Sequence, residues 1–95
     1  MKNKTTEQLK AKREALRKEL AGLGPVMRGS VVVIGTKSKR AYFSMNKDRK
    51  TRIIYLGEAR QATARTYADN YRRLLAIADE MTLATMELLR RGEEA

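Results

Sequence analysis

The residues whose chemistry stands out are basic, and they gather in two short polar stretches. Residues 35–40 read GTKSKR, residues 46–50 read NKDRK, and Arg52 follows two positions later. Clustered Lys and Arg side chains bind phosphate oxygens, so these stretches predict contact with a polyanion. A solvated surface is the alternative for each single residue, because basic turns also keep a domain soluble and protect edge strands.

The composition excludes most other chemistry. The 95 residues include 21 Lys and Arg against 11 Asp and Glu, with a net charge of +10 and neither His nor Cys. Without imidazole or thiolate, the chain has no group for a zinc site, a disulfide or a histidine-activated nucleophile. We therefore expect a protein that is not an enzyme and that holds neither a metal nor another cofactor.

The positive charge is concentrated in the middle of the chain. Residues 28–65 hold ten basic residues against two acidic ones, a net charge of +8, whereas residues 66–95 hold four against six, a net charge of −2. A charge of +8 over so short a segment exceeds what solubility requires. The expected polyanion contact therefore belongs to this middle segment.

The first element that can position these residues is an amphipathic helix over residues 5–22. Leucines recur every seven residues at 9, 16 and 23, with charged residues between them. Thr5 or Thr6 can cap the first free amides. The run GLGP from residue 22 ends the helix, with Gly22 suited to a left-handed cap.

The middle segment, residues 28–57, predicts a three-stranded antiparallel sheet. Runs rich in β-branched and aromatic residues, at 31–34, 41–45 and 51–56, alternate with the two basic stretches. The stretches then form two adjacent cationic loops. A major groove admits such a ribbon, so we expect the sheet to enter duplex DNA.

The two surfaces of this sheet follow from the register of the last two strands. We expect Met45 to pair with Thr51, which places Ala41 and Phe43 on the surface that packs on a helix. The residues on the opposite surface are then Arg40, Tyr42, Ser44, Arg52 and Ile54. A slip of one residue would exchange the two surfaces.

The last segment, residues 58–91, contains neither Gly nor Pro and predicts one long helix. Its apolar residues follow a spacing of four and three, at Ala64, Tyr67, Tyr71, Leu74, Ala78, Met81, Thr85 and Leu88. Such a seam suits coiled-coil packing. We expect a single α+β domain in which the two helices form an antiparallel, coiled-coil-like hairpin. Apolar side chains beyond the reach of the first helix predict a homo-oligomer, with contacts at Leu74, Met81, Leu88 and Leu89.

The candidate binding residues belong to the sheet and to the start of the long helix. The residues expected to bind nucleic acid are Lys37, Lys39, Arg40, Tyr42, Ser44, Lys47, Arg49, Lys50, Arg52, Arg60 and Arg65. Arg40, Ser44 and Arg52 would reach base edges, and Tyr42 would make an apolar or stacking contact. The remaining basic residues would hold phosphates.

Four runs of the sequence resemble a known family. These runs are GSVVV from residue 29, AYFSM from residue 41, KTRIIYLG from residue 50 and NYRRLL from residue 70. They resemble a family of short bacterial and archaeal proteins of unknown function that are often found near transposase and other mobile-element genes. The similarity covers roughly residues 28–91. Some relatives carry a cysteine cluster in the hairpin region, and since this sequence has none, no metal site is carried over.

The strand region is also similar to the arm-type DNA-binding domain of tyrosine-recombinase integrases, on the pieces YF at residue 42 and RIIYLG at residue 52. That resemblance implies DNA binding through Arg40, Tyr42, Ser44 and Arg52. Here a long helix follows in place of a recombinase core, so the resemblance implies a free-standing accessory factor or repressor of a mobile element.

Three other functions stay open. The same basic surface could bind RNA, or it could serve a mobile-element protein that binds and inhibits a nucleic-acid-processing host protein. The third is a coiled-coil scaffold whose charge serves only solubility. The longest apolar run, residues 31–34, is too short to span a bilayer, and no signal peptide is apparent. We expect a cytoplasmic protein that does not bind a membrane.

Overall fold

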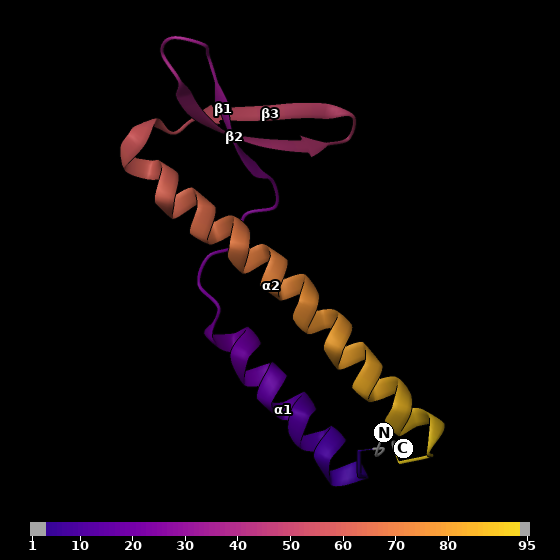
Figure 1. Ribbon diagram of the computed structural model, residues 1–95. Helices are drawn as coiled ribbons and strands as arrows, with labels where there is room; N and C mark the ends of the chain where they lie inside the picture. Colours follow the sequence, from indigo (N-terminus) through magenta and orange to yellow (C-terminus); the bar gives the residue numbers. More distant parts are fainter. Residues whose placement is uncertain (1–3, 94–95) are drawn as a thin grey trace. The chain divides into compact units, whose positions relative to one another are not determined.

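The computed structural model describes residues 4–93 and contains two helices and one sheet (Figure 1). In chain order the elements are α1 (Thr6–Gly22), β1 (Ser30–Ile34), β2 (Arg40–Lys47), β3 (Lys50–Tyr55) and α2 (Gly57–Arg90). The strands form one antiparallel sheet in the order β1-β2-β3, so β1 and β3 are its edges. The prediction of an α+β fold with a long C-terminal helix is confirmed.

The chain divides into two compact units. Among the described residues, the helical unit comprises 4–23 and 73–93, and the sheet unit comprises 24–72. The first half of α2 therefore belongs to the sheet unit and its second half to the helical unit. That all 95 residues fold as one domain stays a prediction.

The start of α1 is fixed by a capping box. The hydroxyl of Thr5 accepts a hydrogen bond from the backbone amide of Gln8 at 3.1 Å, and the Gln8 side chain accepts one from the Thr5 amide at 2.9 Å. Two otherwise unpaired amides are thereby satisfied, so that Thr5, one of the two expected capping residues, is the N-cap. At the other end the cap residue is Leu23 in an extended conformation, so the left-handed cap expected at Gly22 is wrong.

The helical unit has a small apolar core of its own. Leu9 from α1 packs with Ala84 and Leu88 from α2, and Leu16 and Ile77 are also buried. The expected seam placed residue 78 in this core, but that alanine is exposed. The neighbouring isoleucine is buried instead, because a larger apolar side chain gains more free energy from burial.

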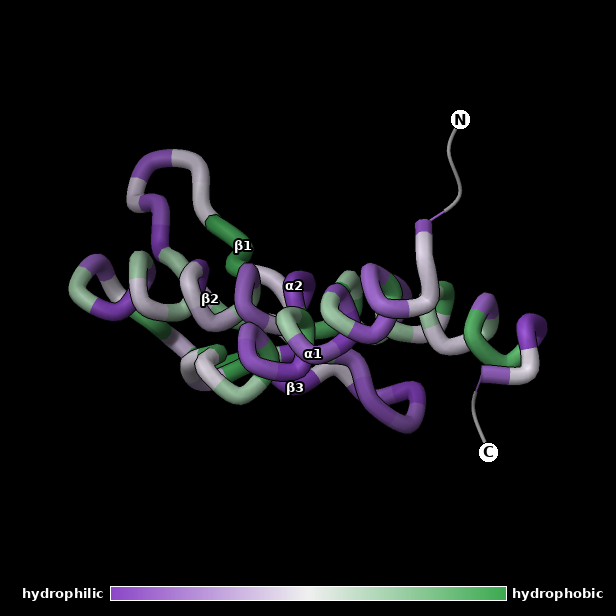
Figure 2. Tube along the Cα trace, turned by 90° about the horizontal axis from the view of Figure 1, so that it is seen from below, coloured by the Kyte–Doolittle hydropathy of each residue, from purple (hydrophilic) through white to green (hydrophobic). Residues whose placement is uncertain are grey.

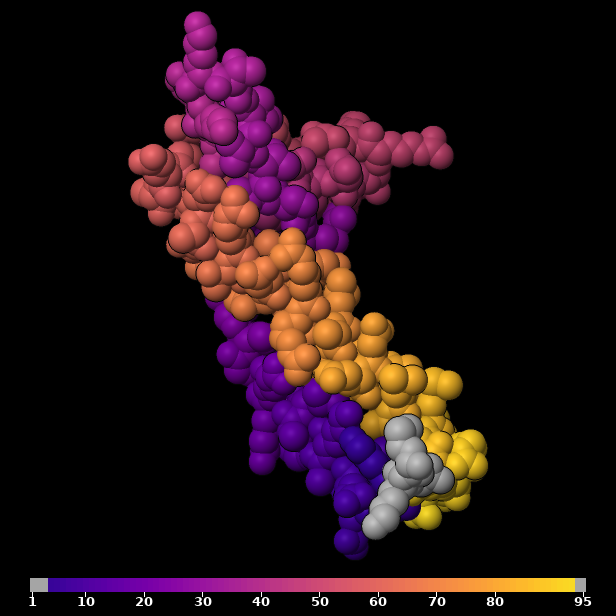
Figure 3. Space-filling view, in the orientation of Figure 1, coloured from indigo at the N-terminus to yellow at the C-terminus, as the bar shows by residue number. Residues whose placement is uncertain are grey.

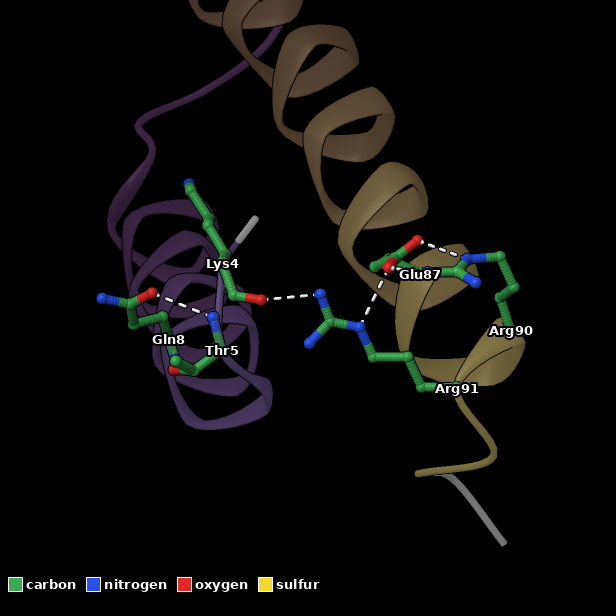
Figure 4. Close-up of polar contacts among 6 residues, drawn as sticks. All are labelled: Lys4, Thr5, Gln8, Glu87, Arg90 and Arg91. Carbon is green, nitrogen blue, oxygen red and sulfur yellow. Dashed lines mark hydrogen bonds and ion pairs between the residues drawn. The ribbon is translucent and has the colours of Figure 1, made fainter. Parts of the chain in front are cut away.

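Polar contacts in the helical unit follow an antiparallel order. Near the end of α1, Glu19 accepts hydrogen bonds from the guanidinium of Arg73 at 2.5 and 2.6 Å. Near its start, the Lys4 carbonyl accepts one from Arg91 at 2.6 Å (Figure 4). Glu87 accepts hydrogen bonds from both Arg90 and Arg91 in the last turns of α2.

These ion pairs make the helical unit sensitive to acid. Hydrogen bonds from Arg90 and Arg91 lower the pKa of Glu87 from 4.5 to about 2. A carboxyl whose pKa is depressed on folding stabilises the protein above its unfolded pKa, and this contribution is lost as the pH falls through the folded pKa. We expect Glu87→Gln to be less stable than the wild type at pH 6, and this difference to vanish between about pH 4.5 and pH 2.

Thermal unfolding across this pH range measures the difference directly. Glu93→Gln is the matched control, because Glu93 makes no ion pair within the described residues. A gap between wild type and Glu87→Gln that stays constant down to pH 2 would contradict the ion pairs.

The core of the sheet unit lies between β2 and the first half of α2. Ala41 and Phe43 from the strand pack with Ala64 and Ala68 from the helix. Leu56, between β3 and α2, belongs to the same buried cluster. Two alanines let the helix backbone approach the sheet closely. Tyr67 and Tyr71, which the expected seam included, are only half-buried.

Gly29 is required where the chain enters β1. A Cβ atom at this position would lie 2.4 Å from the Ser44 carbonyl oxygen and 2.7 Å from the Phe43 ring. We expect Gly29→Ala to lower the free energy of unfolding by about 1–3 kcal/mol, because the core must shift to admit the methyl group. Urea denaturation measures this loss. Gly22→Ala is the control, since nothing lies within 4 Å of its Cβ, and an equal loss there would contradict the packing argument.

Candidate nucleic-acid interface

The two faces of the sheet are set by the pairing of its strands. Phe43 pairs with Val31 on one side and with Ile54 on the other, so these three residues share the face that carries the core. We call this the inner face. The residues on the opposite, outer face are Ser30, Val32, Ile34, Arg40, Tyr42, Ser44, Asn46, Thr51, Ile53 and Tyr55.

The register expected between the last two strands is wrong by one residue. Met45 pairs with Arg52 rather than with Thr51. Arg52 and Ile54 therefore lie on the inner face, while Ile53 and Tyr55 lie on the outer face. The register differs because the connection is a two-residue turn, which fixes the pairing on either side of it.

This turn, Asp48–Arg49, has an unusual conformation for its sequence. Both residues have positive φ, 53° and 64°, as a type I′ turn requires. Glycine is the favoured second residue, and an arginine there costs roughly 1 kcal/mol. On either side of the turn, Lys47 and Lys50 pair directly across the hairpin. Like charges in that position are destabilising. We call residues 47–50 the basic turn; its composition adds charge at the expense of hairpin stability.

The second basic segment is the loop between β1 and β2, residues 35–39, followed by Arg40 at the start of β2. In a meander, successive hairpin loops lie at opposite ends of the shared strand. β2 has eight residues, so the two basic segments are separated by roughly 23 Å along the sheet (Figure 1). The expectation that they are adjacent is wrong. Both project from the surface (Figure 3).

The centre of the outer face is aromatic and apolar. Tyr42 and Tyr55 pair across the strands, with ring centroids 5.4 Å apart in an edge-to-face arrangement. Beside them, Ile34, Ile53 and Tyr55 are 52%, 49% and 50% exposed. In Figure 2, β1 is coloured green, as hydrophobic, and the basic turn is coloured purple, as hydrophilic. The outer face is thus an apolar strip with a cationic segment at each end.

Eight of the eleven expected binding residues lie on the outer face or in the basic segments at its two ends. The outer face and the two basic segments contain Lys37, Lys39, Arg40, Tyr42, Ser44, Lys47, Arg49 and Lys50. Three are placed elsewhere. Arg52 lies on the inner face, and Arg60 donates a hydrogen bond to the Leu56 carbonyl at 2.8 Å within the first turns of α2. Arg65 lines a pocket of about 170 Å³ between β1 and α2.

Arg28 belongs with the basic turn, although the sequence did not place it there. Its guanidinium donates a hydrogen bond to the Asn46 carbonyl at 2.9 Å, so it is held beside the end of β2. Antiparallel pairing of β1 with β2 brings the chain before β1 to this end. The sequence offered a signal for this placement, because Arg28 lies two residues before the first strand and antiparallel pairing carries it to this end of β2.

The charge of the sheet unit is largely uncompensated. Residues 24–72 hold eleven Lys and Arg against three acidic residues, a net charge of +8. Among residues 4–93, the ion pairs involve none of the basic residues from 28 to 65. On α2, Glu80 and Glu87 instead pair with arginines of the helical unit, and Asp69 pairs with its neighbour Arg72.

A depression of about 280 Å³ lies at the Arg40 end of the sheet. It is lined by Lys39 from the loop, by Arg40 and Tyr55 from the strands, and by residues of the first turns of α2, including Glu58. The part of the chain that the structure describes contains no cluster of acidic, His or Cys side chains that could hold a metal.

Comparisons with known proteins add no relatives: no family model, no curated protein and no solved structure matches the chain. Within residues 4–93, neither helix has a stretch apolar and long enough to cross a bilayer.

Proposed function

We propose that this protein binds nucleic acid through the outer face of its sheet and the two basic segments at its ends, without catalysing a reaction. The observation that carries the proposal is the basic turn. Lys47, Arg49 and Lys50 occupy positions where folding alone favours other residues. A charge that opposes folding is expected where it serves binding.

The uncompensated charge of the sheet unit supports the same function. Phosphate contacts from Lys and Arg release counterions, so affinity falls steeply with salt. Arg28 and the basic turn at one end, with Lys39 and Arg40 at the other, would contact two separate parts of a phosphate backbone. Both duplex DNA, which the sequence favours, and RNA carry such a backbone.

Fluorescence anisotropy at several salt concentrations tests the proposal. The probes are labelled 15-nucleotide strands of DNA and RNA and 15-base-pair duplexes of each. We expect binding whose log affinity decreases linearly with log salt concentration, with a slope that indicates at least three phosphate contacts. A protein that binds none of the four probes at 50 mM salt would refute the proposal. Binding that is insensitive to salt would favour a protein partner instead.

A second copy of the chain is the proposed partner of the helical unit. On α2, Leu75, Leu83, Met86 and Leu89 are 48–68% exposed. At 100° per residue they form one stripe, on the side of α2 opposite to the buried Ile77, Ala84 and Leu88. Leu83, Met86 and Leu89 adjoin one another at intervals of three residues, whereas Asp79 lies between them and Leu75. Neighbouring exposed apolar side chains of this kind mark an association surface.

A homo-oligomer through this stripe predicts a specific loss of association. Leu83→Lys and Met86→Lys should each shift the mass toward the monomer in sedimentation equilibrium, because a lysine cannot be buried between two apolar surfaces without a partner. Ala15→Lys, which adds the same charge at an exposed position of α1, should leave the mass unchanged. A wild-type protein that stays monomeric at 100 μM would contradict this part of the proposal.

The biological setting follows from the resemblance alone. We propose a cytoplasmic accessory or regulatory factor of a mobile element, with the nucleic acid of that element as its ligand. Inhibition of a nucleic-acid-processing host protein stays the alternative if the salt titration finds no affinity for nucleic acid.

A further inference from the structure

We infer that the outer face is a stacking platform, and that its ligand is a single strand with unpaired bases rather than a closed duplex. The inference rests on the proposed function and names the class of nucleic acid. It is carried by the apolar and aromatic side chains of Val32, Tyr42 and Tyr55 in the middle of the outer face, between the two basic segments.

The middle of the outer face carries no Arg, Asn or Gln side chain, and its polar groups there are the hydroxyls of Ser30 and Ser44. Base edges in a groove are recognised by polar side chains such as Arg, Asn and Gln. Arg52, the basic strand residue expected there, lies on the inner face. The row formed by Val32, Tyr42 and Tyr55 instead crosses all three strands with apolar and aromatic groups.

The tyrosine pair has the geometry of a base-stacking site. The two rings are 61° apart in interplanar angle, so they present differently oriented surfaces on the same face. Tyr55 is half-exposed, and Ile53 and Ile34 extend the apolar surface on either side of the row. Unpaired bases stack on such aromatic rings independently of sequence, whereas bases inside a duplex already stack on one another.

The charges are placed where a single strand would need them. Arg40 is two residues from Tyr42 along β2 and on the same face, so at about 3.3 Å per residue it can reach a phosphate next to a base stacked on Tyr42. The basic turn lies at the opposite end of β2, where it can contact a phosphate further along the strand. The depression lined by Lys39, Arg40 and Tyr55 adjoins the same row. The negatively charged strand therefore complements the cationic ends and its bases complement the apolar middle.

The first test compares strand forms at equal salt. We expect a labelled (dT)15 or (rU)15 strand to bind at least tenfold more tightly than a blunt 15-base-pair duplex in 100 mM salt. Electrostatics alone predicts the reverse order, because the duplex has the higher charge density. The DNA and RNA strands distinguish the two possible sources of the ligand. Equal or tighter binding of the duplex overturns the inference, although the proposed function survives.

The second test uses the tyrosines themselves. Tyr42→Leu and Tyr55→Leu should weaken single-strand binding by about 5- to 100-fold, and the duplex should be affected less. Tyr67→Leu is the control, since Tyr67 lies on α2 outside the outer face. Unchanged affinity in both outer-face variants overturns the inference.

A spectroscopic test avoids any effect of leucine on folding. The chain has four Tyr and no Trp, so its intrinsic emission comes from tyrosine. We expect (dT)15 to quench this emission in the wild type. The double variant Tyr42→Phe, Tyr55→Phe should keep the affinity, because phenylalanine also stacks, but lose the quenching. Quenching that persists in the double variant would place the bases elsewhere.

Discussion

The triple variant Lys47→Gln, Arg49→Gly, Lys50→Gln should bind single-stranded nucleic acid about 100-fold more weakly than the wild type at 0.1 M salt. Each phosphate contact contributes about 0.7 to the salt slope of a single strand, so three contacts account for about two powers of ten between 0.1 and 1 M salt. The slope should decrease by about two. Anisotropy titrations at four salt concentrations measure both quantities.

The same variant should be no less stable than the wild type. Glycine at position 49 removes the cost of an arginine at φ 64°, and the glutamines remove the like-charge pair across the hairpin. We therefore expect an unchanged or higher melting temperature together with the lost affinity. A loss of affinity accompanied by unfolding would not support the basic turn as a binding site.

A second triple variant controls for net charge. Arg60→Gln, Arg65→Gln, Arg72→Gln also removes three positive charges from the sheet unit, but from positions on α2, outside the outer face and the basic segments. We expect less than about a fivefold loss of affinity, because long-range attraction is screened beyond roughly 10 Å at 0.1 M salt. If both variants lose affinity equally, the placement of the charge is irrelevant and the proposed interface is wrong.

Leu88→Ala should lower the free energy of unfolding by about 2–5 kcal/mol, while Leu89→Ala should change it by less than about 0.5 kcal/mol. The two leucines are neighbours with opposite surroundings, since Leu88 is fully buried against Leu9 and Ala84 and Leu89 is 58% exposed. Urea denaturation compares them under identical conditions. Equal effects would mean that α2 presents a different face to α1.

This pair also separates folding from association. Leu88 was expected to serve the contact with a second copy, but its burial within the chain assigns it to the core of the helical unit. Leu89 lies on the exposed stripe, so Leu89→Ala should weaken the proposed oligomer without unfolding it. Leu74 and Met81, the other expected contact residues, are half-buried.

The order and type of the elements were predictable because their signals are local. Seventeen residues of α1 begin at a capping residue that the sequence identifies, and thirty-four residues of α2 lack any helix breaker. Strand-forming runs between basic stretches likewise predicted the meander. These signals depend on near neighbours along the chain, which a sequence displays directly.

Which side chains of β3 lie on the outer face was not predictable from the sequence. The set of residues expected at the binding site was therefore partly wrong. A two-residue turn is recognised by Asn-Gly or Asp-Gly, but here the turn is Asp48–Arg49, so the sequence lacks the usual marker. Tyr55 was consequently missed as the partner of Tyr42, and Arg52 was expected on the wrong face. The sequence of β3, KTRIIY, gives no alternation of polar and apolar residues that could correct this.

The exposure of β3 has a consequence for how the protein behaves in concentrated solution. An edge strand presents unpaired amides and carbonyls to which the strand of another molecule can hydrogen-bond. On β3 the obstacle to such pairing is electrostatic repulsion, supplied by Lys50 and Arg52. Repulsion of this kind weakens as ions screen it, so aggregation should become more pronounced as ionic strength increases.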